Sequence, residues 1–251
     1  MVTHIFSVKC VTDMHVGDGE ANYSIIDNRV QKDTVLQDVP IIHASGVKGA
    51  LKEHFVRIWK DVDNKTERLK TIFGDSGGMG EYKFFNAVCL ARPLRVTKGE
   101  KPYVLATSPE ILRYFSELLK SLGREELYEK LTGSPTDEKT EVEVEGVNKR
   151  SVKISLLEEE NSEKEDFVVI DDLRDYDLPV RARNVLDENG ISKNLWYEEL
   201  VPHKSIFIFA VMVPDNDSYY KDFIEGIKDT TVQFGGNASI GNGYTKITEV
   251  I

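Results

Sequence analysis

Four glycines interrupt a strand-like segment near the C-terminus, and they limit its backbone more than any other feature of the chain. Residues 230–246 read TTVQFGGNASIGNGYTK, with glycines at Gly235, Gly236, Gly241 and Gly243. Because glycine weakens a strand, it is expected where the chain needs a positive φ or where another backbone approaches closely. An ordinary hairpin turn accounts for this pattern. A concave anion site also accounts for it, because unhindered N–H groups in such a turn can bind a phosphodiester.

The composition indicates a folded globular protein. The chain has 251 residues, enough for one large domain or two small ones, and 40% of them are hydrophobic and 30% charged. The longest apolar run, residues 206–214, is too short to span a bilayer and predicts a buried strand. Cys10 and Cys89 lack CxxC spacing, and the first ten residues lack the features of a signal peptide. We therefore expect no membrane association and a reducing, cytoplasmic environment.

The net charge of −11 argues against a polyanionic partner, since nucleic-acid affinity comes from cations that neutralise phosphates. Much of the acid, however, lies in loop-like segments at residues 137–146, 158–166 and 171–177. An acidic exterior with one basic groove is compatible with this pattern if the fold brings the basic residues to one face. Those residues are Lys48, Lys52, Arg57, Arg92, Arg95, Lys98, Arg181 and Arg183.

The N-terminal half contains a predicted strand, a long loop and a helix. Residues 3–12 alternate between apolar and polar side chains, which predicts a half-buried strand. Residues 13–39 form an unusually long loop, and such loops are usually functional. Ser45 is expected to cap a helix that runs to about Lys60, because apolar side chains recur at helical spacing. A strand over residues 83–94 follows and is expected to end near Pro93.

The C-terminal half begins with a helix that has Ser108 as N-cap, Pro109 in its first turn and Gly123 after its last. Residues 178–196 predict two strands around the Asn189-Gly190 turn. A strand at residues 201–213, a helix at 217–228 and the glycine-rich strand follow. Residues 133–166 are polar, and the sequence does not decide between a partly mobile segment and an edge hairpin. The order of elements predicts an α+β fold, a ferredoxin-like core with long insertions.

Five separated segments resemble one family. They read MHVGDGEANYSIIDNRVQKD (14–33), IIHASGVKGALKEHF (41–55), NAVCLARPLRV (86–96) with TSPEILRYF (107–115), LPVRARN through NLWYEELVP (178–202), and FGGNASIGNGYTKI (234–247). In this order they resemble the RAMP superfamily of CRISPR proteins, and within it the repeated backbone subunit, subunit four, of Cmr-type (type III-B) effector complexes. Residues 133–166 match no motif of the family.

The resemblance implies a single RAMP domain over residues 1–251. Its expected parts are a ferredoxin-like (RRM-like) palm, an active-site loop inserted at residues 13–39 and a protruding thumb β-hairpin inserted at 178–199. Several copies would stack along a guide RNA beside other Cmr-type subunits. Each copy would wedge its thumb into the guide–target duplex and cut target RNA at regular intervals.

The resemblance also implies an endoribonuclease in which a ribose 2′-hydroxyl attacks the adjacent phosphate. The expected cofactor is a divalent cation, Mg²⁺ or Mn²⁺, recruited with the RNA. One alternative is a non-catalytic RNA-binding filament subunit of the same complex. A second alternative, from another functional class, is a ferredoxin-like enzyme that binds a nucleotide or another anionic small molecule in the glycine-rich loop.

Four residues are catalytic candidates. Asp27 lies where the family carries its essential aspartate, and it can bind a metal ion together with phosphate oxygens or orient the 2′-hydroxyl. An ordinary turn aspartate is the alternative, and Asp18 and Asp33 are weaker candidates. His15 matches a family position and can exchange protons near pH 7, although a structural histidine fits equally. Glu198 and Glu199 lie at the foot of the thumb, and strand alternation lets at most one face the cleft.

The RNA-binding candidates come from three segments. Lys48 in the first turn of a helix is unfavourable for the helix dipole, which indicates that it serves an anion. The family binds a guide-RNA phosphate at this position, so Ser45, Gly46 and Gly49 join Lys48, with Lys52 and Arg57 extending the surface. In the thumb, Pro179, Val180 and Leu186 offer an apolar wedge, and Arg181 and Arg183 offer phosphate contacts. Val185 and Leu186 are equally compatible with the palm core. The four glycines of the tail complete the set.

Overall fold

The computed structural model describes residues 1–19, 25–99, 101–132, 139–144, 147–152, 167–228 and 230–250. Most of the acidic segment at residues 133–166 therefore lies outside the described residues. Within the described ranges, no helix is both long and apolar enough to cross a membrane.

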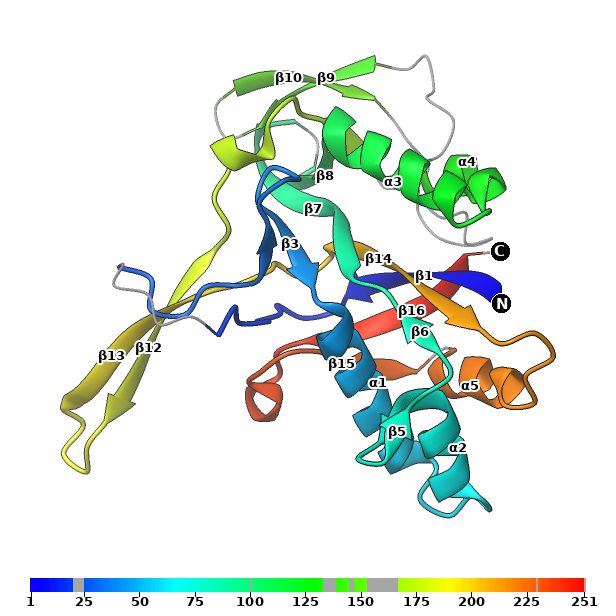
Figure 1. The fold of residues 1–251 in the computed structure, drawn as a ribbon. Coiled ribbons are helices and arrows are strands. Elements are labelled where there is room, and N and C mark those ends of the chain that lie inside the picture. Colours follow the sequence, from blue (N-terminus) through cyan, green and yellow to red (C-terminus); the bar gives the residue numbers. More distant parts are fainter. Residues whose placement is uncertain are drawn as a thin grey trace.

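Four antiparallel strands form the centre of the molecule. They are β1 (Val2–Cys10), β7 (Ala87–Lys98), β14 (Ile206–Val213) and β16 (Tyr244–Val250), in the order β16-β1-β14-β7. Helix α1 (Ala44–Ile58) lies between β1 and β7 in the chain, and α5 (Tyr220–Ile227) lies between β14 and β16. Both helices pack on the same side of the sheet (Figure 1), where Phe55 of α1 stacks on Phe223 of α5 at 5.2 Å.

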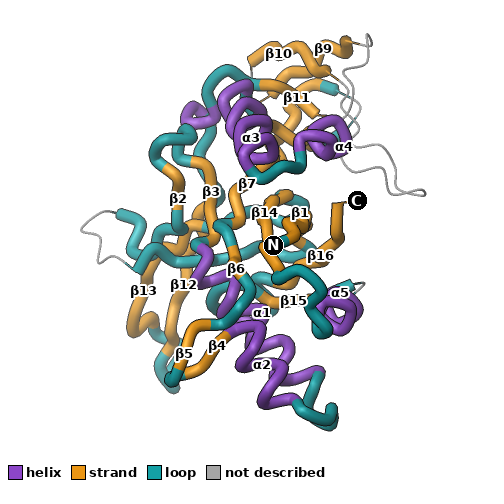
Figure 2. The backbone as a smooth tube through the Cα atoms, turned by 45° about the vertical axis from the view of Figure 1, so that its right-hand side comes forward, coloured by secondary structure: helices purple, strands orange, loops and turns teal. Residues whose placement is uncertain are grey.

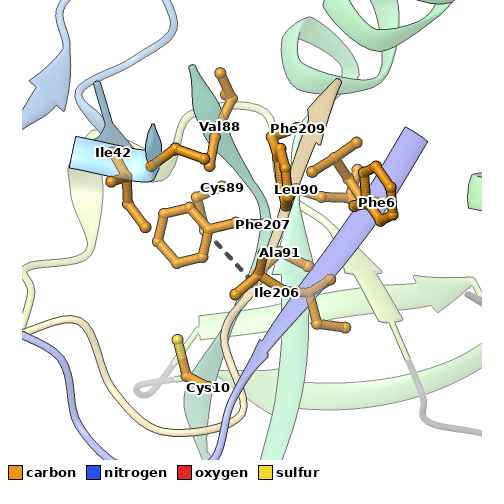
Figure 3. Close-up of a cluster of buried hydrophobic side chains, with 14 of the residues drawn as sticks. Phe6, Cys10, Ile42, Val88, Cys89, Leu90, Ala91, Ile206, Phe207 and Phe209 are labelled. Atoms are coloured by element: carbon orange, nitrogen blue, oxygen red, sulfur yellow. Dashed lines mark hydrogen bonds between the residues drawn. The ribbon is translucent and has the colours of Figure 1, made fainter. Parts of the chain in front are cut away.

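Strand β1 is buried on both faces, so the prediction of a half-buried strand is wrong. Ile5, Phe6, Ser7 and Val8 are all buried in succession. Phe6 stacks on Phe209 of β14 with ring centroids 5.1 Å apart, within the cluster of apolar side chains drawn in Figure 3. Alternation in the sequence could not show this, because the cover on the second face comes from distant parts of the chain.

A second unit is built on the far end of β7. There β7 pairs with β8 (Tyr103–Thr107), and the ladder continues through β11 (Phe167–Val169), β10 (Val147–Val152) and β9 (Lys139–Val144) back to β7. The five strands thus form a closed ring. Pro93 does not end β7. It lies between Ala91, the last residue paired with β14, and Val96, the first residue paired with β9. On this edge of β7 no neighbouring strand needs an N–H donor at Pro93.

The helix signals in the sequence are confirmed for α3 (Pro109–Ser121) but only partly for α1. Ser108 Oγ accepts the N–H of Ile111 at 3.3 Å, and Gly123 has φ +68°. Helix α1 begins at Ala44, so the predicted Ser45 cap is wrong. His43 is the N-cap and makes no side-chain bond, and Asn86 Oδ1 accepts the N–H of Ala44 at 2.8 Å instead.

The remaining elements have nine residues or fewer, and α2 had no sequence prediction. They are β2 (Lys32–Asp33), β3 (Val39–Ile42), α2 (Lys65–Phe73), β4 (Gly74–Asp75), β5 (Gly78–Met79), β6 (Lys83–Phe84), η1 (Glu125–Leu127), α4 (Tyr128–Thr132), η2 (Leu173–Asp175), β15 (Thr231–Gln233) and η3 (Ala238–Ile240). Figure 2 shows α3 and α4 at one end of the molecule and α1, α2 and α5 at the other.

A two-stranded hairpin, β12 (Val180–Leu186) and β13 (Ser192–Glu199), extends away from the rest of the molecule (Figure 1). The hairpin predicted at this position is therefore present. In its turn, Asp187 Oδ1 accepts the N–H groups of Asn189 and Ile191, and Gly190 has φ +78°. A left-handed glycine after a turn is typical of hairpin loops longer than two residues.

Candidate active site

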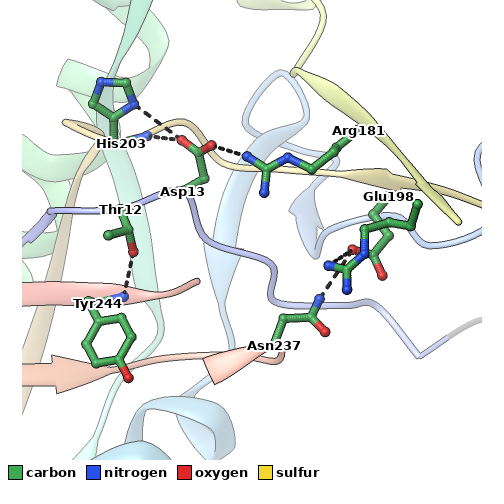
Figure 4. A network of polar contacts seen from close by, with 8 residues as sticks. Thr12, Asp13, Arg181, Glu198, His203, Asn237 and Tyr244 are labelled. Atoms are coloured by element: carbon green, nitrogen blue, oxygen red, sulfur yellow. Dashed lines mark hydrogen bonds and ion pairs between the residues drawn. The ribbon is translucent and has the colours of Figure 1, made fainter. Parts of the chain in front are cut away.

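Three segments that are far apart in the sequence meet at the base of the hairpin. They are the loop after β1, the ends of β12 and β13 nearest the sheet, and the glycine-rich tail between β15 and β16 (Figure 4). Residues of the loop pair with β13 and with the residues directly after it, since Asn28 forms a parallel bridge with Glu198 and Met14 an antiparallel one with Val201. The sequence candidates of the loop, the hairpin and the tail are thus brought together.

Asp27 is exposed and is fixed by the edge of β13. Its Oδ2 accepts the N–H of Tyr197 at 2.8 Å, and the Tyr197 carbonyl accepts the N–H groups of Asp27 and Asn28, both at 3.1 Å. Among the described residues, Oδ1 of Asp27 has no hydrogen-bond partner. One oxygen therefore orients the carboxylate, and the other is available to a ligand.

His15 is buried, and its ring is held by β13. Its Nδ1 lies 2.8 Å from the Glu199 carbonyl oxygen. A carbonyl can only accept, so Nδ1 carries the proton and Nε2 is the nitrogen left to accept one. The space around Nε2 is tight, because a Cβ added to Gly17 would lie 3.2 Å from it. This geometry gives His15 a structural contact and leaves a single ring nitrogen for chemistry.

Glu198 and Glu199 point to opposite faces of β13, and both are buried and bonded. Glu198 is 5% exposed and accepts from Trp196 Nε1 at 2.8 Å, Asn237 Nδ2 at 3.2 Å and Arg183 Nη1 at 3.3 Å. Glu199 is 4% exposed and accepts from the Val30 N–H at 3.1 Å and Lys32 Nζ at 2.6 Å. Neither carboxylate is open to a ligand in this arrangement.

The two arginines of the hairpin are each paired with an acidic side chain. Arg181 Nη2 lies 2.6 Å from Asp13 Oδ2, and Arg183 pairs with Glu198 while its guanidinium lies 5.7 Å from the centre of the Trp196 ring. Asp13 Oδ1 also accepts the N–H of His203 at 3.0 Å (Figure 4). Arg181 therefore holds the hairpin to the loop, whereas Arg183 pairs within the hairpin.

Two of the four tail glycines, Gly235 and Gly243, lie where the protein is closely packed. A Cβ on Gly235 would lie 2.2 Å from the His15 carbonyl oxygen, and one on Gly243 would lie 1.9 Å from that of Phe234. The N–H groups of Gly236, Gly241 and Gly243 donate to His15, Ala238 and Asp13 carbonyls at 2.9, 3.0 and 2.8 Å. These three N–H groups are thus bonded internally, and the expected phosphate-binding cradle of bare amides does not fit them.

The start of α1 is open to solvent. Ser45, Gly46 and Gly49 are exposed, and Lys48 is half-buried with no hydrogen bond or ion pair among the described residues. Lys52 Nζ donates to the Gly74 carbonyl at 2.7 Å, and Arg57 Nη2 lies 3.4 Å from His54 Nδ1. Of the three expected cations on this helix, Lys48 is the one without an internal contact.

Gln31 connects the start of α1 to the loop, and no sequence pattern indicated this role. Its Oε1 accepts the N–H of His43 at 3.0 Å, and its Nε2 donates to the Gly17 carbonyl at 3.0 Å. Asp13, Lys32 and Asn237 were likewise missed. Asn237 had a usable signal, because asparagine is among the few residues that tolerate a left-handed backbone beside glycines.

The residues around Asp27 do not form a metal site by themselves. Among the described residues, no group of three or more His, Cys, Asp or Glu side chains is placed to hold a metal ion. Asp27 provides one free carboxylate oxygen, and the nearby acids Glu198 and Glu199 already have partners. Mg²⁺ is usually bound by one or two carboxylates together with substrate phosphates and water. Asp27 alone therefore supplies at most part of the ligands that the ion needs.

The comparison with protein families agrees with this fold, a curled antiparallel sheet with helices. The model of the RAMP superfamily matches residues 7–246, and the chain belongs to this superfamily. This confirms the resemblance that the five sequence segments carry.

Among curated proteins, the chain is similar to the CRISPR system Cmr endoribonuclease Cmr4 of Pyrococcus furiosus, with 25% identity over 289 residues that cover 99% of this chain and 96% of the relative. Among solved structures, it matches a chain of the type III-B Cmr-beta complex bound to cognate target RNA, with a TM-score of 0.78, 20% identity and coverage of 100% and 98%. Oligomeric Cmr4 from Pyrococcus furiosus matches with a TM-score of 0.67, 21% identity and the same coverage. The structural matches show a shared fold.

Proposed function

We propose that this protein is the repeated backbone subunit of a type III-B CRISPR effector complex, and that within the complex it cuts target RNA complementary to a guide RNA. The observation that carries the proposal is the Asp27 carboxylate, which is exposed and oriented at the base of a protruding hairpin in a RAMP-superfamily chain. The similar protein from Pyrococcus furiosus is named an endoribonuclease. A chain of similar fold occurs in a complex bound to target RNA.

The architecture supports this role. We interpret β16-β1-β14-β7 with α1 and α5 as a ferredoxin-like palm, because the strand order and the two crossover helices are those of a split βαβ unit. The hairpin β12–β13 is the proposed thumb, and residues 13–39 are the proposed active-site loop. Exposed apolar side chains at Leu186, Ile191 and Leu195 give the thumb a surface suited to contact unstacked bases.

The proposed chemistry uses one oxygen of Asp27. The ribose 2′-hydroxyl gives its proton to Oδ1, its oxygen forms a bond to the adjacent phosphorus, and the 5′-oxygen of the next nucleotide leaves with a proton from water. General-base catalysis of this kind contributes about 10²–10⁴-fold to a rate. Mg²⁺ or Mn²⁺ would enter with the RNA and be held by phosphate oxygens, water and Asp27, and no step here depends on it.

The proposed guide-RNA contact is the start of α1. Lys48 is a cation without an internal partner among the described residues, and the exposed small residues Ser45, Gly46 and Gly49 allow a backbone to approach. Arg181 is exposed and keeps donors beyond the one bonded to Asp13, so it can also contact a phosphate. The proposed partners are guide RNA, target RNA, further copies of this chain and other Cmr-type subunits.

A non-catalytic filament subunit is the second candidate. The observation in its favour is that His15, Glu198 and Glu199 are all buried and engaged in internal contacts, which leaves Asp27 as the one open side chain among the four catalytic candidates. This alternative predicts a complex that binds target RNA and never cuts it.

The test is single-turnover cleavage of complementary RNA by the assembled complex carrying Asp27→Asn. Asparagine can still accept the Tyr197 N–H, so the fold and RNA affinity should be kept while the rate falls about 100-fold or more. Asp33→Asn is the matched control, because Asp33 lies in the same loop and accepts the N–H groups of Val35 and Leu36. Cutting by Asp27→Asn at the wild-type rate would remove Asp27 from the mechanism, and an intact complex that binds but never cuts would favour the filament role.

A further inference from the structure

A buried carboxylate joins the hairpin to the glycine-rich tail. Glu198 lies on β13, and its three hydrogen-bond donors come from two different parts of the chain. Arg183 and Trp196 belong to the hairpin itself, whereas Asn237 belongs to the tail. In the described part of the chain, the bond from Asn237 Nδ2 to Glu198 Oε2, at 3.2 Å, is the one direct side-chain hydrogen bond between the tail and β13.

This bond acts next to Asp27. Glu198 directly follows Tyr197, whose N–H holds Oδ2 of Asp27 and whose carbonyl accepts the N–H groups of Asp27 and Asn28. A shift of Glu198 along or across β13 therefore moves the backbone groups that orient Asp27. Well-placed catalytic groups lose much of their rate after displacements of about 1 Å.

Asn237 is itself firmly held. Gly236, its neighbour, donates its N–H to the His15 carbonyl at 2.9 Å, and the Asn237 carbonyl accepts the N–H groups of Ile240 and Asn242 at 3.1 and 3.3 Å. Its backbone is left-handed, with φ +63°. The side-chain amide of Asn237 is thus attached to a well-fixed backbone, as a residue that positions another group requires.

The geometry points to Asn237 as a positioning residue for cleavage at Asp27: through Glu198 it fixes the base of the hairpin, and with it Tyr197, against the glycine-rich tail. Its effect on cleavage rests on the proposed function, whereas its effect on the hairpin does not. Among the described residues, Asn237 makes no hydrogen bond to Asp27, so its effect on Asp27 passes through Glu198.

Asn237→Asp is the sharpest perturbation. It replaces one NH₂ by an oxygen of the same size, and aspartate tolerates a left-handed backbone as asparagine does. The new carboxyl faces Glu198, and two carboxylates in one site repel until one of them takes up a proton. Arg183 also faces Glu198, while Arg181, opposite Glu198 in the strand pairing, is bound to Asp13. The contact should therefore be lost at high pH and return as the pH falls.

Asn216→Asp is the matched control. Asn216 is also left-handed, with φ +59°, and it is exposed in the connection between β14 and α5. Asn216→Asp makes the same change in charge and in backbone preference as Asn237→Asp. Among the described residues, its side chain makes no hydrogen bond.

Two measurements test the proposal. The first is amide hydrogen exchange of residues 192–199 in the full chain, which reports the hairpin without any RNA. We expect Asn237→Asp to exchange about tenfold faster than wild type at about pH 8 and to approach wild type at about pH 5.5. The second is single-turnover cleavage by the assembled complex. We expect a rate about tenfold below wild type at about pH 8, recovering as the pH falls, with target affinity unchanged.

The outcomes separate this proposal from the proposed function. Unchanged exchange in Asn237→Asp overturns the proposal, and so does faster exchange with cleavage at the wild-type rate. Equal effects in Asn216→Asp also overturn it, because charge alone would then be the cause. If the wild-type complex cuts no RNA, the proposed cleavage fails, whereas faster exchange in Asn237→Asp would still support the contact between tail and hairpin.

Discussion

Substitution of single tail glycines by alanine separates two explanations of the glycine-rich segment. Gly235 and Gly241 both have a left-handed backbone, with φ +77° and +85°. They differ in what surrounds them, because a Cβ at Gly235 would lie 2.2 Å from the His15 carbonyl oxygen and one at Gly241 would have nothing within 4 Å. Gly235→Ala and Gly241→Ala therefore share the free-energy cost of a left-handed backbone. Only Gly235→Ala adds a steric clash with the His15 carbonyl.

The magnitudes follow from these distances. A left-handed backbone costs a residue with a Cβ about 1–2 kcal/mol, and the loss of glycine from the unfolded chain returns about 0.4–1 kcal/mol. Gly241→Ala should thus cost about 1 kcal/mol. At Gly235 the carbonyl of His15 must also move by roughly 1 Å to reach a normal contact. This movement breaks its bond from the Gly236 N–H, and a buried acceptor left without a partner adds about 1–3 kcal/mol.

The assay is thermal and urea unfolding of the isolated chain, with RNA binding measured in parallel. A difference of about 2 kcal/mol between the two variants corresponds to roughly 4–8 °C in Tm for a chain of this size. Gly236→Ala, which has no positive φ and a contact of 4.0 Å to His15, should change little. Equal stability of Gly235→Ala and Gly241→Ala would refute the packing explanation. Loss of RNA affinity in Gly241→Ala at full stability would instead favour an anion site.

Two further predictions concern buried charges and thiols. Lys32→Met should destabilise the protein by about 2 kcal/mol, less than for a fully buried pair because Lys32 is 28% exposed, and adding Glu199→Gln should restore much of that loss in urea unfolding. An unchanged midpoint in Lys32→Met would contradict this. Burial raises the pKa of Cys89 to about 12 and raises that of Cys10 further, so neither thiol should react with iodoacetamide near pH 8 until the protein unfolds, as mass spectrometry would report.

The sequence predicted those elements whose signals lie next to each other in the chain. Ser108, Pro109 and Gly123 mark both ends of α3, and Asn189-Gly190 marks the hairpin turn, because caps and turns are local interactions. The predictions that failed depended on distant partners. Asn86, 42 residues away, caps α1 in place of Ser45, and β7 passes Pro93 because it exchanges one neighbouring strand for another.

The candidate site shows the same division. Strand alternation correctly put Glu198 and Glu199 on opposite faces of β13, but it could not show that each face would supply a partly exposed cation, Arg183 on one and Lys32 on the other. The positive φ of Gly235 follows from its residue type. The close approach of the His15 backbone to Gly235 depends on how the tail and the loop after β1 meet. No local sequence pattern predicts this contact.

The charges of the site also bear on how a chain with a net negative charge can bind a polyanion. Arg181 and Arg183 are already paired with Asp13 and Glu198, so a phosphate must compete with a carboxylate for each of them, and Lys48 is the expected RNA contact without an internal partner among the described residues. Among the described residues expected to bind RNA, one copy therefore offers few unpaired cations, and its affinity for RNA alone should be low. Copies linked side by side add their small contributions, because each later contact becomes intramolecular. Such a charge distribution favours a subunit that binds RNA as one of several copies over a protein that binds it alone.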